Sequence, residues 1–306
     1  MEYLGYAKFL PRKYLADPLI APEPTWWEWR GRRVHVARAR DSSAPVRVLG
    51  VHGLGGHAGL LWVAAGVGMR EGMEVMAIDL PLYGDTVEAD PGAVRYADWV
   101  DMLCEFVCAE TESDDRPLVL FGASMGGMVA YEVAARTGRV AQVMATCLSD
   151  PADPAARRAS ARWSFTGGWG PKVLAAVAPI LGNVRVPIRW LVDMRNMSLD
   201  PELSRMCATD PRGGGVRVPL GLLGSFLSYR HFVPEEFTAT PVTLVHPAAD
   251  RWTPPELSIR FPDRVGAPTR VVLLEGCGHF PIEEPGVTRM VEVLREVVDS
   301  AANRTS

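Results

Sequence analysis

The chain has 306 residues, of which 48% are apolar and 22% are charged, and its net charge is -4. This length allows one large domain with an insertion. The proportion of apolar to charged residues is that of a protein with a buried core, which excludes a disordered chain. Scattered basic residues exclude the basic stripe that nucleic-acid binding requires, and no run of about 18 apolar residues indicates a membrane span. The first 21 residues lack the continuous apolar stretch of a signal peptide, so we expect a soluble cytoplasmic protein.

The first 24 residues are predicted to form an N-terminal extension, and the pattern that follows them indicates a sheet. Residues 26–39 alternate apolar and polar side chains around Gly31, which predicts an antiparallel hairpin at a sheet edge. Apolar runs typical of buried parallel strands then occur at residues 46–51, 73–80, 118–122 and 140–147.

Amphipathic patterns accompany these runs. Apolar side chains recur with helical spacing over residues 96–110, 125–137 and 287–298. Gly138 follows the second of these segments, where a glycine commonly ends a helix, and Pro285 precedes the third. Because strands that alternate with helices form a parallel sheet with crossover helices, we expect an α/β fold.

A long segment interrupts this alternation. Residues 150–236 are rich in Ala, Pro, Gly and aromatic side chains, and strand patterns resume only at 241–245 and 269–274. We therefore predict a core formed by residues 25–149 and 237–306, with a mainly helical cap inserted at 150–236 over the carboxyl edge of the sheet.

The cysteines predict neither disulfides nor a metal site. They are five in number and lie mostly in apolar segments, which favours reduced thiols. Cys104 and Cys108 share a helix face, but no further Cys or His pair accompanies them.

The strongest motif for chemistry surrounds Ser124. The sequence Gly-Ala-Ser-Met-Gly at 122–126 follows an apolar run and precedes a helical pattern, as in the nucleophile elbow G-x-S-x-G. Glycines suit this motif because the sharp turn holds the serine in a strained backbone conformation close to its neighbours. We predict Ser124 as the nucleophile.

A serine nucleophile needs a base, and the chain has six histidines. His279 follows the strand pattern that ends at Leu274, so a loop at the carboxyl end of that strand projects it over the sheet edge. We predict His279 as the base; the alternative is a loop histidine that caps the following helix.

The base in turn needs a carboxylate that orients it and stabilises its protonated form. Asp250 follows the strand pattern immediately before that of His279 and is the predicted acid. The alternative is an aspartate that caps a turn or helix, and Asp150 and Asp193 are the other candidate acids.

The order Ser124, Asp250, His279 and three further motifs resemble the α/β-hydrolase fold family, and more narrowly its capped esterases and monoacylglycerol-lipase-like members. The motifs are His-Gly-Leu-Gly-Gly at 52–56, Asp-Leu-Pro-Leu-Tyr-Gly at 79–84 and Gly-Cys-Gly-His at 276–279. The resemblance covers about residues 45–149 and 240–300 and little of the cap.

The resemblance implies an oxyanion hole formed by the backbone N–H groups of Leu54 and Met125. It also implies that His52 holds its loop and is not catalytic. One departure concerns Leu82, which stands where related sequences often have glycine.

The predicted function is hydrolysis of a carboxylic ester through an acyl-enzyme on Ser124, with no cofactor and no metal. A small apolar ester is the expected partner, and Trp163, Phe165 and Trp169 of the cap are predicted to bind it. Amide or C–C bond cleavage and acyl transfer use the same triad and stay open, as does a non-catalytic binding protein on this fold. The sequence leaves the oligomeric state open.

Overall fold

The structure is a computed structural model that describes residues 3–15, 20–153, 180–190 and 192–304. Its centre is an eight-stranded sheet with the order β1-β2-β4-β3-β5-β6-β9-β10. The strands are β1 (Glu23–Trp29), β2 (Arg32–Ala39), β3 (Val46–Val51), β4 (Met73–Ile78), β5 (Leu118–Gly122), β6 (Gln142–Ala145), β9 (Val242–Pro247) and β10 (Thr269–Leu274).

The sheet is antiparallel at one edge and parallel elsewhere. β1 and β2 form the predicted hairpin, and β2 pairs antiparallel with β4. All the remaining pairs, from β4 to β10, are parallel. The carboxyl ends of six strands therefore meet at one edge, which is the place where open α/β sheets carry their sites.

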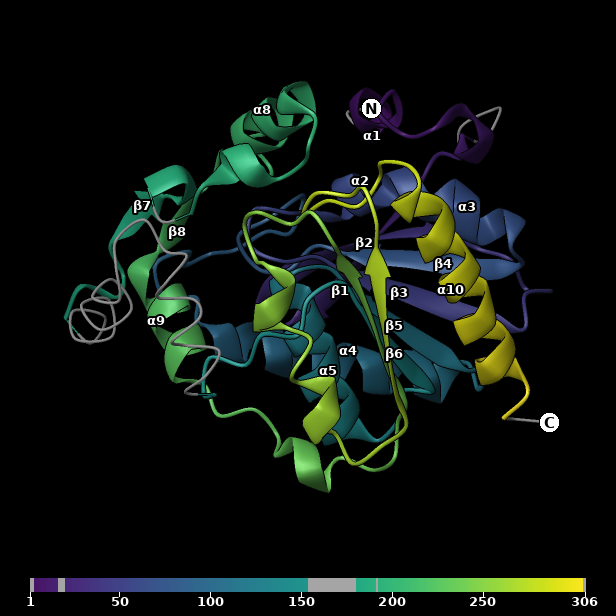
Figure 1. Cartoon of the computed structure of the whole chain (residues 1–306). Coiled ribbons are helices and arrows are strands. Elements are labelled where there is room, and N and C mark those ends of the chain that lie inside the picture. Colours follow the sequence, from purple (N-terminus) through teal and green to yellow (C-terminus); the bar gives the residue numbers. More distant parts are fainter. Residues whose placement is uncertain (1–2, 16–19, 154–179, 191, 305–306) are drawn as a thin grey trace.

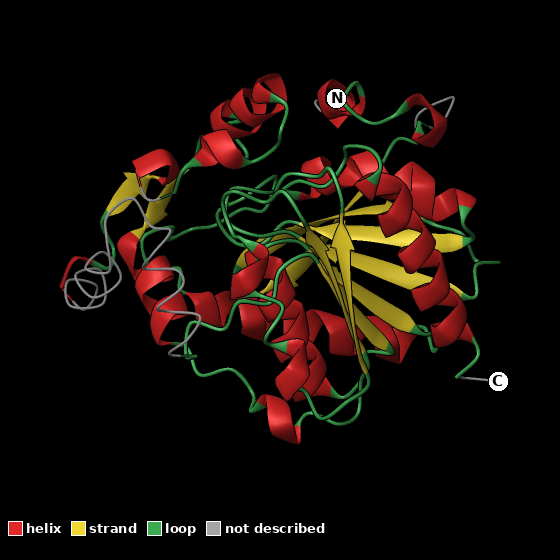
Figure 2. Cartoon of the chain, viewed as in Figure 1, coloured by secondary structure: helices red, strands yellow, loops and turns green. Residues whose placement is uncertain are grey.

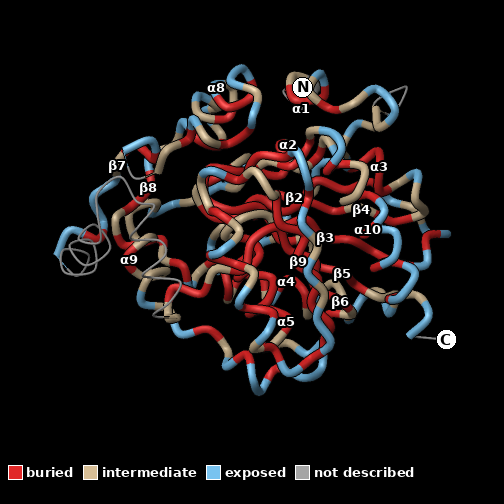
Figure 3. The backbone as a smooth tube through the Cα atoms, in the orientation of Figure 1, coloured by how far each residue is buried: buried red, intermediate tan, exposed pale blue. Residues whose placement is uncertain are grey.

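Helices cover both faces of this sheet (Figures 1 and 2). One face is covered by α2 (Ala58–Leu61), α3 (Ala65–Arg70) and α10 (Gly286–Ala302), and the other by α4 (Tyr96–Ser113) and α5 (Met125–Thr137). Side chains of β3 alternate between the two: Val46 and Val48 pack with α10, whereas Leu49 and Val51 pack with α4 and α5. The central strands β3, β4, β5, β6 and β9 are accordingly mostly buried, whereas the edge strands β1 and β10 keep exposed residues (Figure 3).

The segment between β6 and β9 adds elements outside the main sheet. β7 (Arg185–Pro187) and β8 (Arg217–Pro219) pair antiparallel, beside α8 (Pro201–Thr209) and α9 (Leu220–Ser228). It touches loops at the carboxyl edge, because Phe280 N–H donates to Met197 O over 2.7 Å and Gly84 N–H to Arg212 O over 3.0 Å.

The remaining elements are short. They are α1 (Tyr3–Ala7) and the 3-10 turns η1 (Arg12–Tyr14), η2 (Trp62–Ala64), η4 (Ile188–Trp190), η5 (Met194–Asn196), η6 (Pro234–Glu236), η7 (Pro255–Leu257) and η8 (Pro262–Arg264). Within the described ranges, no helix is both long enough and apolar enough to cross a membrane. The predicted mostly parallel sheet flanked by helices is confirmed.

Candidate active site

Ser124 lies at the tight turn between β5 and α5. Its backbone has φ 53° and ψ -126°, a conformation that residues other than glycine rarely adopt. The helix α5 begins at the next residue. The Ser124 N–H donates to Thr146 Oγ1 over 2.9 Å, from the end of the neighbouring strand β6. The strained turn raises the serine above the carboxyl edge of the sheet.

The glycines around Ser124 allow α5 to approach the sheet. A Cβ atom on Gly126 would lie 2.3 Å from the Val51 carbonyl oxygen, and one on Gly127 would lie 2.1 Å from that of Cys147. No side chain fits at either position without moving the backbone. The elbow is therefore specified sterically by these two residues.

His279 and Asp250 form a buried pair at the ends of β10 and β9. Asp250 Oδ2 lies 2.7 Å from His279 Nδ1, and Asp250 Oδ1 accepts the N–H groups of Trp252 and Thr253. Burial raises the pKa of Asp250, but the nearby His279 and the hydrogen bonds outweigh it and lower that pKa. Asp250 is thus an ionised carboxylate that holds His279 with Nδ1 facing it.

Thr253 and Trp252 hold this pair from the side. The Thr253 hydroxyl donates to Asp250 Oδ2 over 2.7 Å, and its oxygen lies 3.1 Å from His279 Nδ1. The Trp252 ring packs on the His279 ring with their centres 4.5 Å apart. Thr253 is not identified from the sequence as part of the site, since a hydroxyl contact between two loops leaves no pattern in the chain.

Ser124 and His279 line the same cavity, together with His52, Gly53 and Leu54. The His279 Nε2 atom is buried and has no hydrogen-bond partner among the described residues. A buried ring nitrogen of this kind can exchange a proton with a group that enters the cavity.

The loop that carries Leu54 lies directly against the elbow. A Cβ on Gly53 would lie 2.8 Å from both the Ala123 carbonyl oxygen and the Met125 nitrogen. Leu54 is the next residue, so the two backbone N–H groups expected to form an oxyanion hole belong to segments in contact.

His52 ties this loop to the end of β4. Its Nδ1 lies 2.8 Å from the Gly53 carbonyl oxygen, and its Nε2 accepts the N–H of Leu80 over 3.0 Å. Burial lowers the pKa of His52 to about 4, so the ring is neutral and carries its proton on Nδ1. This arrangement fits the loop-holding role that the resemblance implies.

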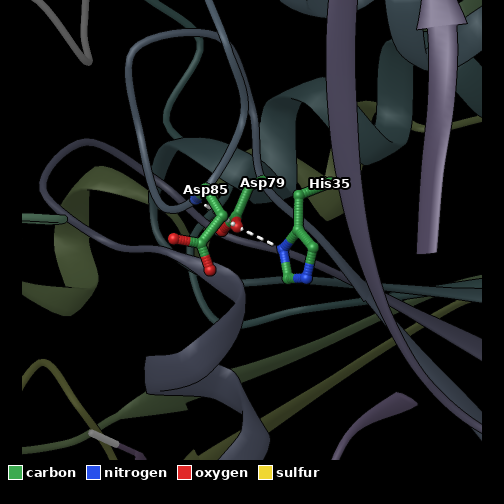
Figure 4. A group of neighbouring side chains, drawn as sticks. All are labelled: His35, Asp79 and Asp85. Carbon is green, nitrogen blue, oxygen red and sulfur yellow. Dashed lines mark hydrogen bonds and ion pairs between the residues drawn. The ribbon is translucent and has the colours of Figure 1, made fainter. Parts of the chain in front are cut away.

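A cluster of His35, Asp79 and Asp85 offers donors of the type that bind metals (Figure 4). Asp79 Oδ2 lies 2.6 Å from His35 Nδ1 and accepts the N–H of Asp85, whereas its Oδ1 accepts the N–H of Ala58. Both oxygens of the central carboxylate therefore bind protein donors. The cluster joins β2, the end of β4 and the start of α2, and we assign it to holding these loops.

Leu82 explains the departure seen in the sequence. Its φ is 87°, in the left-handed region that favours glycine. The turn after β4 therefore has a backbone conformation that favours glycine, although a leucine occupies the position.

The other candidate acids lie elsewhere in the fold. Asp150 pairs with His231 Nδ1 at 3.3 Å, and Asp193 contacts Arg195 within its own turn. The predicted substrate-binding residues Trp163, Phe165 and Trp169 lie outside the described residues.

Comparisons with known proteins agree with this fold. The sequence family described as the alpha/beta hydrolase family matches residues 48–291. A monoglyceride lipase of Saccharomyces cerevisiae, in complex with a substrate analogue, superposes with a TM-score of 0.77 at 16% identity, covering 95% of this chain and 98% of the lipase.

Two further solved structures are similar in fold. A carboxyl esterase of Bacillus coagulans has a TM-score of 0.68 at 17% identity over 92% of this chain and 99% of its own. A monoacylglycerol lipase of Paleococcus ferrophilus has a TM-score of 0.67 at 21% identity over 87% of this chain and 99% of its own.

One curated relative matches a shorter stretch. The AMB antimetabolite synthetase AmbE of Pseudomonas aeruginosa is 35% identical over 109 residues, which is 35% of this chain and 5% of the synthetase. The chain thus spans only a small part of that protein.

Proposed function

The chain belongs to the alpha/beta hydrolase family, and from this premise we propose that it is a serine hydrolase that cleaves a carboxylic ester. The observation that carries the proposal is the shared cavity of Ser124 and His279, with Asp250 on the far side of the histidine ring. The lipase and esterase structures of the same fold support the choice of an ester.

In the proposed first half-reaction, Ser124 Oγ attacks the acyl carbonyl carbon and transfers its proton to His279 Nε2. Asp250 stabilises the protonated histidine through Nδ1, and the N–H groups of Leu54 and Met125 stabilise the oxyanion. His279 then gives the proton to the departing alkoxide, which leaves as the alcohol, and an acyl-enzyme on Ser124 remains.

In the second half-reaction, His279 Nε2 takes a proton from water, which attacks the acyl carbonyl and releases the carboxylic acid. Protonation of Ser124 Oγ restores the enzyme. Amide or C–C bond cleavage and transfer of the acyl group to another acceptor are the alternatives, since they use the same residues.

Steady-state hydrolysis of p-nitrophenyl butyrate by the wild type and by Ser124→Ala tests the proposal. We expect kcat to fall by roughly 10⁴–10⁶ in the alanine variant. A matched p-nitroanilide should be cleaved far more slowly than the ester by the wild type. An alanine variant as active as the wild type would contradict the serine mechanism, and a preference for the anilide would contradict the ester specificity.

A further inference from the structure

The cavity at Ser124 does not end at the carboxyl edge of the sheet. It continues into the space between the sheet and the helices α2, α3 and α10, as far as Met290 and Leu294. We propose that this inner space binds the acyl chain of the substrate, and that the chain is long and apolar. The inference rests on the proposed function, because it takes the acyl group to be the one transferred to Ser124.

The two walls of the inner space come from elements on one face of the sheet. Val48, Val75 and Phe121, from β3, β4 and β5, line it on one side. Val67 of α3 and Leu294 of α10 line it on the other. From Val287 to Leu294 the cavity follows α10 for about 10 Å, at a rise of ~1.5 Å per residue.

Incomplete burial marks the same place. β3, β4 and β5 are neighbours in the centre of the sheet, where every apolar side chain is expected to be covered. Val75 and Phe121 nevertheless keep part of their surface accessible, as do Met290 and Leu294 of α10. Because protein interiors rarely leave voids larger than a water molecule, a continuous space here calls for an occupant.

Two glycines line this space, and neighbouring side chains pack closely against both. Gly50 lies in the interior of β3, and a Cβ there would meet Leu61 Cδ1 at 3.1 Å. Gly68 lies inside α3, where a Cβ would lie 2.7 Å from Val75 Cγ2. Glycine weakens both strands and helices, so these positions are better explained by the close approach of the Leu61 and Val75 side chains that they allow than by local structure.

The lining decides the chemistry of the occupant. The polar side chains that line the cavity are His52, Ser124, Thr146 and His279, near the elbow and the predicted oxyanion loop, and those of the inner part are aliphatic or aromatic. A polar or charged group in the inner part would lose its hydration without gaining hydrogen bonds. A hydrocarbon chain attached to a carbonyl at Ser124 fits both parts of the cavity, because the carbonyl lies among the polar side chains and the chain lies in the apolar inner part. The alcohol portion of the ester leaves in the other direction.

The test is the ratio of kcat/KM for p-nitrophenyl dodecanoate to kcat/KM for p-nitrophenyl acetate. For the wild type we expect kcat/KM to rise about three- to fourfold with each added methylene until the cavity is full. Leu294→Trp should fill the cavity and lower the ratio at least about tenfold. Glu292→Trp adds the same ring to the exposed face of α10 and should leave the ratio unchanged.

Three further measurements keep the test decisive. Met290→Ala enlarges the cavity and should move the optimum to longer chains, which covers the case in which Leu294→Trp fails to fold. Calorimetric binding of dodecanoate to the wild type needs no turnover, and Leu294→Trp should weaken it at least about tenfold. In a pair of acetate esters, one of a long-chain alcohol and one of a short-chain alcohol, the ratio of the two kcat/KM values should be the same in the wild type and in Leu294→Trp.

The outcomes separate the two proposals. If no ester is hydrolysed but dodecanoate binds in a manner sensitive to Leu294→Trp, the hydrolase proposal fails and the apolar site stands. If esters are hydrolysed but neither Leu294→Trp nor Met290→Ala changes the dependence on acyl-chain length, the hydrolase proposal stands and the acyl-site proposal is overturned. If Leu294→Trp changes kcat/KM only in the series that varies the alcohol, the cavity binds the alcohol portion of the ester. This result would also overturn the acyl-site proposal.

Discussion

At the scale of single residues, the Asp250 carboxylate is surrounded by donors. It accepts the N–H groups of Trp252 and Thr253, the Thr253 hydroxyl and His279 Nδ1. These contacts fix the carboxylate in one orientation and thereby fix the histidine ring. Thr253 is a positioning residue in this arrangement because it reaches both members of the pair.

We predict that Thr253→Val lowers kcat/KM about 10- to 100-fold, because a hydrogen bond to a charged group contributes roughly 1.5–3 kcal/mol. Thr253→Ser keeps the hydroxyl and should stay within about threefold of the wild type. Ester hydrolysis by the two variants is the measurement. If valine and serine behave alike, the hydroxyl has no part in holding the pair.

His52 predicts a dependence of stability on pH. Its pKa is about 4 in the folded chain and 6.5 when unperturbed. Between these values the unfolded chain binds a proton that the folded chain does not, so the free energy of unfolding falls as the pH falls. Between pH 7 and pH 5 this loss should be about 2 kcal/mol.

Replacing His52 by Asn removes the titrating group and tests whether His52 causes this loss of stability at low pH. Urea unfolding at pH 7 and pH 5 should show a smaller loss for His52→Asn than for the wild type, whatever the variant's stability at pH 7. Equal losses in the two proteins would show that His52 does not remain neutral on folding.

The site residues that belong to sequence motifs could be predicted from the sequence. The residues that form hydrogen bonds between loops could not. Ser124, His279 and Asp250 follow strand patterns that the sequence displays, so their meeting at one edge could be anticipated. Thr146 and Thr253 contribute single hydroxyl groups, which are common in any chain. Their contacts depend on the exact path of two loops, which periodicity does not define.

At the scale of elements, the hairpin and the strands were predicted closely, because buried parallel strands give short apolar runs with turn residues between them. The helices α2 and α3 were not predicted. Residues 58–70 are almost entirely apolar, so they show no polar face from which a helical period can be recognised. The two short strands of the insertion were also missed, as three-residue strands carry no alternation.

The contact between the loop after β3 and the elbow yields a prediction for Gly53. A methyl group at Gly53 would collide with backbone atoms of Ala123 and Met125 at 2.8 Å. Gly53→Ala should therefore displace the loop and lower kcat/KM by about 100-fold or more, as the loss of an oxyanion donor does.

Gly56→Ala is the matched control for this prediction. A Cβ on Gly56 would lie 3.0 Å from His52 Cβ and 3.4 Å from the Gly53 carbonyl oxygen, which is a milder contact in the same loop. We expect a clearly smaller effect in the hydrolysis assay. Similar activities of the two variants would argue against close contact of the loop with the elbow.

At the scale of the whole molecule, Asp210 joins three parts of the chain that are distant in sequence. It accepts hydrogen bonds from Tyr6 of α1 over 2.5 Å and from His57, before α2, over 2.9 Å. Burial raises the pKa of Asp210, but these two bonds outweigh it and lower the pKa to about 2. The segment between β6 and β9 is thereby joined to the N-terminal segment and to the loop that carries Leu54.

We predict that Asp210→Asn lowers the free energy of unfolding by about 1–3 kcal/mol at pH 7, since it weakens two hydrogen bonds to a carboxylate. Asp193→Asn changes a partly exposed aspartate that contacts its own turn, and it should have a much smaller effect. Urea unfolding of both variants gives the comparison. Equal stabilities would mean that other contacts hold the segment between β6 and β9.

The proposed mechanism requires Ser124 to be an activated nucleophile. Its most direct test is labelling with a fluorophosphonate probe followed by peptide mapping by mass spectrometry. We expect one label per chain, located on Ser124, absent from Ser124→Ala and formed much more slowly in His279→Ala. A label on any other residue, or equal labelling of wild type and Ser124→Ala, would contradict the account.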